Sequence, residues 1–234
     1  MESNPKLEQK TLQKEFPALN KEDMKEIHSL FSELFEQFPE QLPYLEKYTG
    51  INETIGGGDA YINSRVTLFQ FEYALAITRH PLIKKLINIK YNIKPADIEN
   101  LIKNKIMVGI KILDLGCGPE PVFARCCRAM GADVWTVDII SASNFIFDQK
   151  YFTKEQIKLE NEKHIQLNLE DTQAKVIIKS KSSGDFNLVT TANLDSDIVG
   201  SKFKKIEKFI IIPLLKKGGI YRNSGSIESP KLKL

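Results

Sequence analysis

The fold of this 234-residue chain is decided by the stretch Ile112-Leu113-Asp114-Leu115-Gly116-Cys117-Gly118-Pro119-Glu120-Pro121. Its first residues continue a short apolar run of strand length. The two glycines permit a tight turn and close approach of a ligand to the backbone. The two prolines suit the first turn of a helix, where a missing N–H group costs little. The stretch therefore predicts a buried strand, a glycine turn and the start of a helix.

The rest of the second half alternates between short apolar runs and amphipathic segments. We expect strands over 110–115, 133–139, 164–169, 186–191 and 220–222, helices over 122–130, 171–179 and 202–215, and partial helix over 141–158. Such alternation is typical of a parallel sheet with helices on both faces. The predicted fold class is α/β, a doubly wound, mainly parallel, Rossmann-like sheet. Its ligand should lie beyond the carboxyl ends of the strands, beside the first one.

The first 107 residues have a different pattern and are predicted to be mostly helical. Apolar residues at helical spacing favour helices over 20–39, 41–48, 65–79, 81–91 and 95–106. We therefore predict two domains, a helical cap or substrate region over 1–107 and a ligand-binding domain over 108–234. The run Gly56-Gly57-Gly58 is interpreted as a hinge of the cap. Tyr61 and Arg65 follow the hinge and are candidates to reach the ligand.

Composition limits the classes of partner and compartment. The chain has 33 basic and 30 acidic residues and a formal net charge of +3, with lysines scattered along it, so nucleic-acid binding has no strong electrostatic signature. Its three cysteines lack the spacing of a zinc site or a disulfide framework and indicate a reducing compartment. No signal peptide or apolar run of membrane-spanning length is visible. We expect a cytoplasmic protein with no bound metal.

The acidic residues around the glycine turn favour one class of ligand. A dinucleotide site needs a third glycine at position 121, which is Pro121. Asp114 and Glu120 would also repel a pyrophosphate, because like charges ~4 Å apart cost about 4 kcal/mol at an effective dielectric of ~20. A ligand with an ammonium, a sulfonium and one carboxylate avoids this cost. Its carboxylate would lie at the helix N-terminus and its ammonium would face Asp114. S-adenosylmethionine therefore fits this turn better than NAD. The one feature that favours NAD is Asp138, an acid at the spacing from Gly118 that dinucleotide sites have.

The turn resembles the first motif of class I S-adenosylmethionine-dependent methyltransferases, acid-x-Gly-x-Gly-x-Gly. Asp114, Gly116 and Gly118 match this motif, Cys117 lies between the two glycines, and Glu120 replaces the last glycine. The resemblance implies that these residues bind S-adenosylmethionine and that S-adenosylhomocysteine is the product.

Later segments resemble the family's other motifs in the same order. Val134-Trp-Thr-Val-Asp138 resembles the second motif. Asp138 would accept hydrogen bonds from the two ribose hydroxyls, and Ile139 would lie against the adenine. In the segment resembling the third strand, Asn168 would accept from the adenine amino group, with Leu169 beside it. Glu170 or Asp171 could replace Asn168 under a shifted alignment.

The segment over 185–194 resembles the fourth strand, whose end faces the transferred methyl group, and Thr191 and Asn193 would line the site there. The segment Leu214-Leu-Lys-Lys-Gly218-Gly219-Ile220 resembles a helix end and the turn before the fifth strand. No Asn/Asp-Pro-Pro-Tyr/Phe motif is present, so methylation of DNA-base amino groups lacks its usual signature.

The resemblance covers residues 109–222 and implies methyl transfer to a small molecule or a protein side chain. Much of the catalysis would be proximity and in-line orientation. No catalytic residue is assigned, and neither His80 nor His164 falls in a recognisable nucleophile–base arrangement.

The alternative is a catalytically inactive binding or regulatory protein that keeps the methyltransferase fold. Glu120, Asn168 and Asn187 depart from the family pattern, and the chain after 222 is too short for the usual last two strands. Either the sheet is curtailed, or the chain is a fragment or a degenerate member of the family. We expect an exposed sheet edge, which an oligomer partner or the N-terminal helices would cover, and a disordered tail over 231–234.

Overall fold

The computed structural model describes residues 74–75, 77–78, 100–119, 121–145, 152–191, 194, 201–223 and 231–232. Residues 74–75, 77–78 and 100–103 are helical, as predicted. The other predicted helices before residue 100 and the boundary of the cap lie outside the described residues. So do Gly56–Gly58, Tyr61, Arg65, Glu120 and Asn193.

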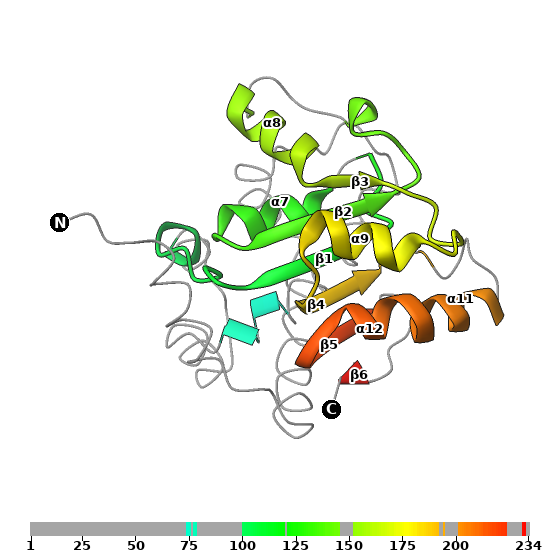
Figure 1. Cartoon of the computed structure of the whole chain (residues 1–234). Coiled ribbons are helices and arrows are strands. Elements are labelled where there is room, and N and C mark those ends of the chain that lie inside the picture. The colour runs from blue at the N-terminus through cyan, green and yellow to red at the C-terminus, as the bar shows by residue number, and fades with distance from the viewer. Residues whose placement is uncertain are drawn as a thin grey trace, which may run out of the picture.

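Five parallel strands form the sheet (Figure 1), in agreement with the predicted α/β fold class. They are β1 (Lys111–Leu115), β2 (Asp133–Asp138), β3 (His164–Gln166), β4 (Phe186–Thr191) and β5 (Leu215–Asn223). Their order is β3-β2-β1-β4-β5, and the two-residue strand β6 (Lys231–Leu232) pairs antiparallel with β5. The chain direction across the sheet reverses at β1, so the loop after β1 lies where ligands of such sheets bind.

Helices connect the strands on both faces of the sheet. Those before β4 are α7 (Val122–Ala129), the 3₁₀ turn η3 (Ala142–Asn144), α8 (Lys154–Glu162) and α9 (Ala174–Ser182). Between β4 and β5 the chain forms α11 (Ser201–Ile206), the π-helical turn η4 (Glu207–Ile211) and α12 (Ile212–Leu214). The π turn comes just before Pro213, which has no N–H group to continue an α-helix. The predicted helix over 202–215 is therefore present but interrupted.

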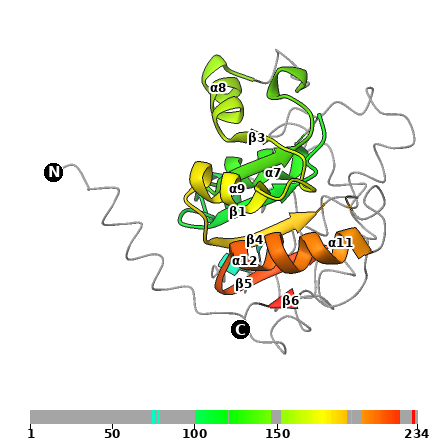
Figure 2. The same cartoon turned by 45° about the vertical axis from the view of Figure 1, so that its right-hand side comes forward.

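The two faces of the sheet differ in polarity because side chains alternate along β1. Leu113 and Leu115 point into a hydrophobic core with residues of α9 and α11, including Ile178 and Phe203. Asp114 points to the opposite face, where it is buried near Arg128 of α7. Figure 2 shows α9 and α11 adjacent on the apolar face. In the described part of the chain, no helix combines the length and the apolar character needed to cross a membrane.

The start of β5 was predicted incorrectly. Gly218 and Gly219 were expected in a turn before a strand over 220–222, yet they lie within a strand that begins at Leu215. The pairing shifts there, because Phe186 is opposite Leu215 and Leu188 is opposite Ile220. The extra residues form a bulge, which two glycines can enter without steric cost.

Gly219→Ala should destabilise the fold by about 2 kcal/mol, the usual cost of overpacking. A Cβ atom at Gly219 would lie 2.9 Å from the backbone oxygens of both Lys216 and Phe186. Urea unfolding of the full chain measures the effect. Gly118→Ala is the control, since a Cβ there meets no atom within 4 Å and only the positive φ of +67° adds strain. An equal or larger loss in Gly118→Ala would contradict the assignment of the bulge.

The chain end also differs from the prediction. Lys231 and Leu232 were expected in a disordered tail, but they form β6, opposite Tyr221 and Ile220 of β5. This edge of the sheet is therefore paired over two residues, where an exposed edge was expected. An oligomer that forms through this edge could pair only with the residues of β5 that β6 does not cover.

Candidate ligand-binding site

The glycine turn after β1 is bonded to the end of β2. Gly116 and Gly118 have φ angles of +70° and +67°, a region that glycine enters without strain. The N–H of Gly116 donates to the Val137 carbonyl at 2.8 Å, and the N–H of Gly118 donates to Oδ2 of Asp138 at 2.9 Å. The structure thus brings together the predicted residues of the first and second motifs.

Asp138 retains capacity to bind a ligand. Its Oδ1 accepts a second backbone N–H, from Ile140 at 3.1 Å, so each oxygen has one internal donor. A carboxylate has about four lone-pair sites, which leaves acceptors for two hydroxyl groups. Ile139 beside it is 68% exposed, and its carbonyl accepts from the Gln166 side chain at 3.1 Å. The turn after β2 therefore presents an anchored acid next to an exposed apolar surface.

Within the part of the chain that the structure describes, the space next to the Cα of Gly118 is open. A Cβ at Gly118 would meet nothing within 4 Å, so no described atom fills the region over this residue. Helix α7 begins four residues later, at Val122, and its N-cap residue is Pro121, which provides no side-chain cap. Uncapped N–H groups at a helix start suit an anionic group of a ligand.

A row of buried polar residues crosses the sheet beneath this turn. Pairing in register places side by side Arg222 of β5, Thr190 of β4, Asp114 of β1, Thr136 of β2 and His164 of β3. All five are buried. Oγ1 of Thr190 donates to Oδ1 of Asp114 at 3.0 Å. We call these five residues the polar row; of the five, only Asp114 was predicted to be a site residue.

Burial raises the pKa of Asp114 from 3.8 to about 7, although the Thr190 hydroxyl and the Arg128 charge oppose the rise. The carboxyl group therefore changes charge near neutral pH. A cation placed near it would favour the ionised form.

His164 holds two parts of the site with its two ring nitrogens. Nε2 lies 2.9 Å from the carbonyl of Ile140, which can only accept, so Nε2 carries the proton. In the neutral ring, Nδ1 then accepts from the Thr136 hydroxyl at 3.0 Å. Burial lowers the pKa of His164, and Phe145 packs edge-on with ring centroids 4.7 Å apart. His164 thus orients the turn after β2, since both nitrogens are already bonded.

Cys117 is half-buried in the glycine turn, and its thiol contacts the carbonyl of Gly118 at 3.5 Å. Burial, together with the nearby Asp114 and Asp138, raises the pKa of this thiol well above its usual value. The group is therefore a neutral thiol and is poorly suited to act as a nucleophile.

The remaining predicted residues have bonds within the protein. Oδ1 of Asn168, an exposed residue, accepts from the N–H of Glu170 at 2.9 Å, and Leu169 is buried in the core. Oγ1 of Thr191 lies 3.3 Å from both the Tyr221 hydroxyl and Oδ1 of Asn223. Asn187 lies at the amino end of β4, where Oδ1 accepts from the N–H of Lys111 at 2.9 Å. Asn168, Thr191 and Asn187 thus each have a hydrogen-bond partner within the protein, and the binding roles of Asn168 and Thr191 stay predictions.

A buried ion pair fixes α7, the helix that follows the glycine turn. Nε of Arg125 lies 2.9 Å from Oε1 of Glu160 on α8, and Nη2 lies 3.1 Å from Oε2. Arg128 approaches the same carboxylate at 3.6 Å and donates to the Val134 carbonyl at 3.0 Å. One carboxylate therefore compensates two buried guanidinium groups.

Among the described residues, no group of three or more His, Cys, Asp or Glu side chains could hold a metal ion.

The chain matches no model of a known protein family and no curated protein. The strand order and the turn that joins β1 to α7 define it as a protein with a Rossmann-like α/β fold.

Proposed function

We propose that the chain is an S-adenosylmethionine-dependent methyltransferase acting on a small molecule or a protein side chain. The observation that supports it best is the carboxylate of Asp138, bonded to the N–H of Gly118 at 2.9 Å and adjacent to the exposed Ile139. A ribose with two free hydroxyls and an attached base matches this arrangement of acceptor and apolar surface. Fold alone carries no such inference, since one fold serves many functions.

Each part of the donor has a candidate partner. Asp138 would accept from the ribose hydroxyls, and Ile139 would pack against the adenine. The donor carboxylate would lie at the start of α7 above Gly118, where no described atom fills the space. Its ammonium would favour the ionised form of Asp114. Such a donor is suited to the acidic turn, whereas a pyrophosphate would be repelled.

The bound donor would supply a methyl group on a positively charged sulfur, which is intrinsically reactive. The work of the protein is then to hold donor and acceptor in line. His164 contributes by fixing the Ile140 carbonyl, and its lowered pKa and bonded nitrogens make it a positioning residue. The free cysteines fit a reducing compartment such as the cytoplasm.

A second candidate is a protein that binds the donor without transferring its methyl group. The observation that favours it is the engagement of Asn168 and Thr191, the residues expected near the adenine and the methyl group, in bonds with Glu170, Tyr221 and Asn223. Donor binding with no methylation of any screened small molecule or protein would support this candidate. Transfer of a labelled methyl group would exclude it.

Calorimetric titration of the full chain tests the donor site. We expect S-adenosylmethionine to bind with micromolar affinity, about −8 kcal/mol, and NAD not to bind. Asp138→Ala should abolish detectable binding. Asp133→Ala is the matched control, because Asp133 begins the same strand and pairs with Lys163 at 2.9 Å, at the far end from the turn. Preferential binding of NAD, or unchanged affinity in Asp138→Ala, would refute the proposed site.

A further inference from the structure

Helices α9 and α11, with the π turn η4, form a layer on the apolar face of the sheet (Figures 1 and 2). Their inner side chains, including Ile178, Phe203 and Ile206, are buried in the core. The opposite sides of these helices point away from the sheet. Their outward surface is far in the fold from the polar row, which lies on the other face.

The exposed residues of these helices include lysines that are separated in the sequence. Seven lysines of α9, α11 and η4 are exposed: Lys175, Lys179, Lys181, Lys202, Lys204, Lys205 and Lys208. Among the described acidic residues near them, Glu207 is half-buried, Glu170 and Asp171 before α9 are exposed, and Glu170 pairs with Lys202 at 3.0 Å. Exposed lysines on these helices therefore outnumber the described acidic residues beside them, although the whole chain carries a net charge of only +3.

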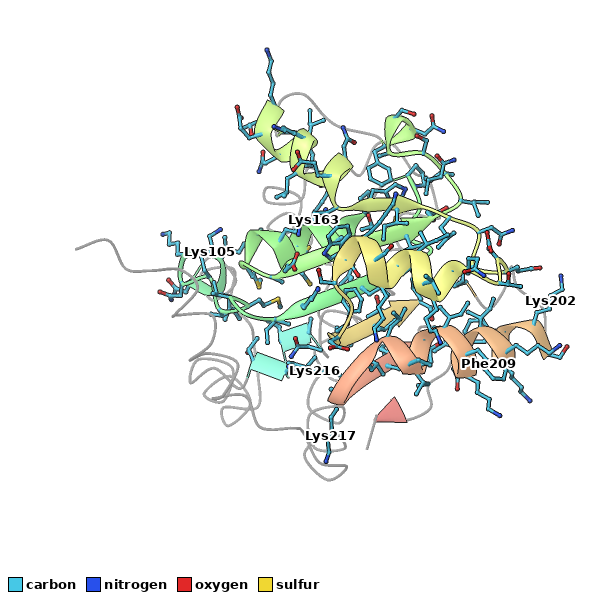
Figure 3. The ribbon with its side chains drawn as sticks, in the orientation of Figure 1. Lys105, Lys163, Lys202, Phe209, Lys216 and Lys217 are labelled. Atoms are coloured by element: carbon cyan, nitrogen blue, oxygen red, sulfur yellow. The ribbon has the colours of Figure 1, made fainter. Side chains whose placement is uncertain are left out.

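Apolar side chains lie among these lysines. Phe209 is 59% exposed, and Val176 is 56% exposed. Nζ of Lys208 lies 5.3 Å from the centre of the Phe209 ring, and Lys205 precedes Phe209 by one helical turn. Figure 3 shows Phe209 and Lys202 along the same helical segment. The arrangement is an exposed aromatic ring within a cluster of cations.

We propose that this surface, which we call the basic face, docks on membranes that contain anionic phospholipids. The lysines would lie among the phosphate and carboxylate headgroups, and Phe209 would enter the interface between headgroups and acyl chains. Lysine suits a diffuse anionic surface, since its long stem allows the ammonium to reach a headgroup while the carbon chain covers apolar area.

A nucleic acid would use different features. Bidentate recognition of phosphates and bases favours arginine, and the described residues of the basic face include none. Single-stranded nucleic acids also stack successive bases on several aromatic rings, whereas Phe209 is the one exposed aromatic residue described on this face. Charge complementarity together with one exposed ring thus favours a lipid surface.

Sedimentation with vesicles tests the proposal on the full chain. We expect binding to vesicles of equal parts phosphatidylcholine and phosphatidylserine and no binding to pure phosphatidylcholine. A variant with Lys204→Gln, Lys205→Gln and Lys208→Gln should bind at least about tenfold more weakly, because the attraction is electrostatic. Phe209→Ser should weaken the binding that remains at high salt, where screening has removed most of the charge attraction.

A variant with the same loss of charge elsewhere is the control. Lys103→Gln, Lys154→Gln and Lys158→Gln change exposed lysines outside the basic face and should leave vesicle binding unchanged. Equal loss in this control, or no vesicle binding by the wild-type chain, would overturn the proposal. Binding to an oligonucleotide but not to vesicles would overturn it in favour of a nucleic acid. Donor titrations are a separate readout, so failure here leaves the methyltransferase proposal intact.

Discussion

Asp114→Asn is expected to stabilise the folded protein at about pH 8 while weakening donor binding. Burial raises the pKa of Asp114 from 3.8 to about 7, so ionising it in the folded state is costly. A rise of about three in pKa corresponds to a penalty on the order of 4 kcal/mol. The amide carries no charge to bury and can still accept from Thr190. It would attract the donor's ammonium less, so affinity should fall about tenfold or more.

The dependence on pH has a defined sign. Between pH 3.8 and about 7, the folded chain keeps a proton on Asp114 that the unfolded chain has lost. The free energy of unfolding contributed by this group therefore falls as pH rises through that range and stays low above it. The free energy of unfolding of Asp114→Asn should therefore exceed that of wild type by an amount that grows with pH and levels off above about pH 7.

Urea unfolding of both proteins at about pH 5 and about pH 8 measures this difference. Asp133→Asn is the control, since Asp133 is an exposed residue paired with Lys163 at the opposite end of the sheet. If the difference in the free energy of unfolding between Asp114→Asn and wild type is the same at both pH values, Asp114 of the folded protein does not change its charge between them. Donor affinity unaffected by Asp114→Asn would remove Asp114 from the binding site.

Glu160→Ala is expected to destabilise the protein by about 3–5 kcal/mol, the cost of leaving a buried charge without its partner. Arg125 and Glu160 are almost fully buried, and Arg128 approaches the same carboxylate. Without it, both guanidinium groups stay buried, that of Arg125 near Cys126 and that of Arg128 near Asp114 and Cys127. Chemical denaturation of the variant gives the free energy of unfolding directly.

Glu162→Ala provides a control on the same helix. Glu162 pairs with Lys158 at 3.8 Å, and both side chains are exposed. Exposed pairs contribute at most about 1 kcal/mol, so this variant should be close to wild type. Replacing both partners, in Arg125→Met with Glu160→Leu, should recover only part of the loss, because Arg128 stays buried without the carboxylate that it approaches. Equal stabilities of Glu160→Ala and Glu162→Ala would refute the role of the buried pair.

Local patterns predicted the parts of the fold that depend on neighbouring residues. The strand, glycine turn and helix from Ile112 to Ala129 follow from backbone preferences of glycine and proline, and they are present. The proximity of Asp138 to Gly118 also followed, because parallel strands end at the same edge of a sheet. Whether Asp138 holds a ribose stays a prediction.

Features that depend on distant pairing were missed. Gly218 and Gly219 suggested a turn, and only the partner strand β4 shows that they form a bulge. Asn187 was read as a substituted motif residue, but its partner is Lys111, far away in sequence. The polar row could not be singled out in the sequence, because β2, β3, β4 and β5 each contain other polar residues and only the strand order aligns these five.

The polar row also bears on how the chain selects one alignment of its strands. All six residues of β4 and four of the five residues of β1 are buried, so the alternation of buried and exposed positions does not by itself fix how the two strands align. Sliding by two residues keeps each side chain on its face but would separate Asp114 from Thr190 and His164 from Thr136. Misaligned sheets would then bury polar groups without partners, at about 1–3 kcal/mol each. The polar row therefore favours the native strand register, because a shifted register would leave its buried polar groups without partners.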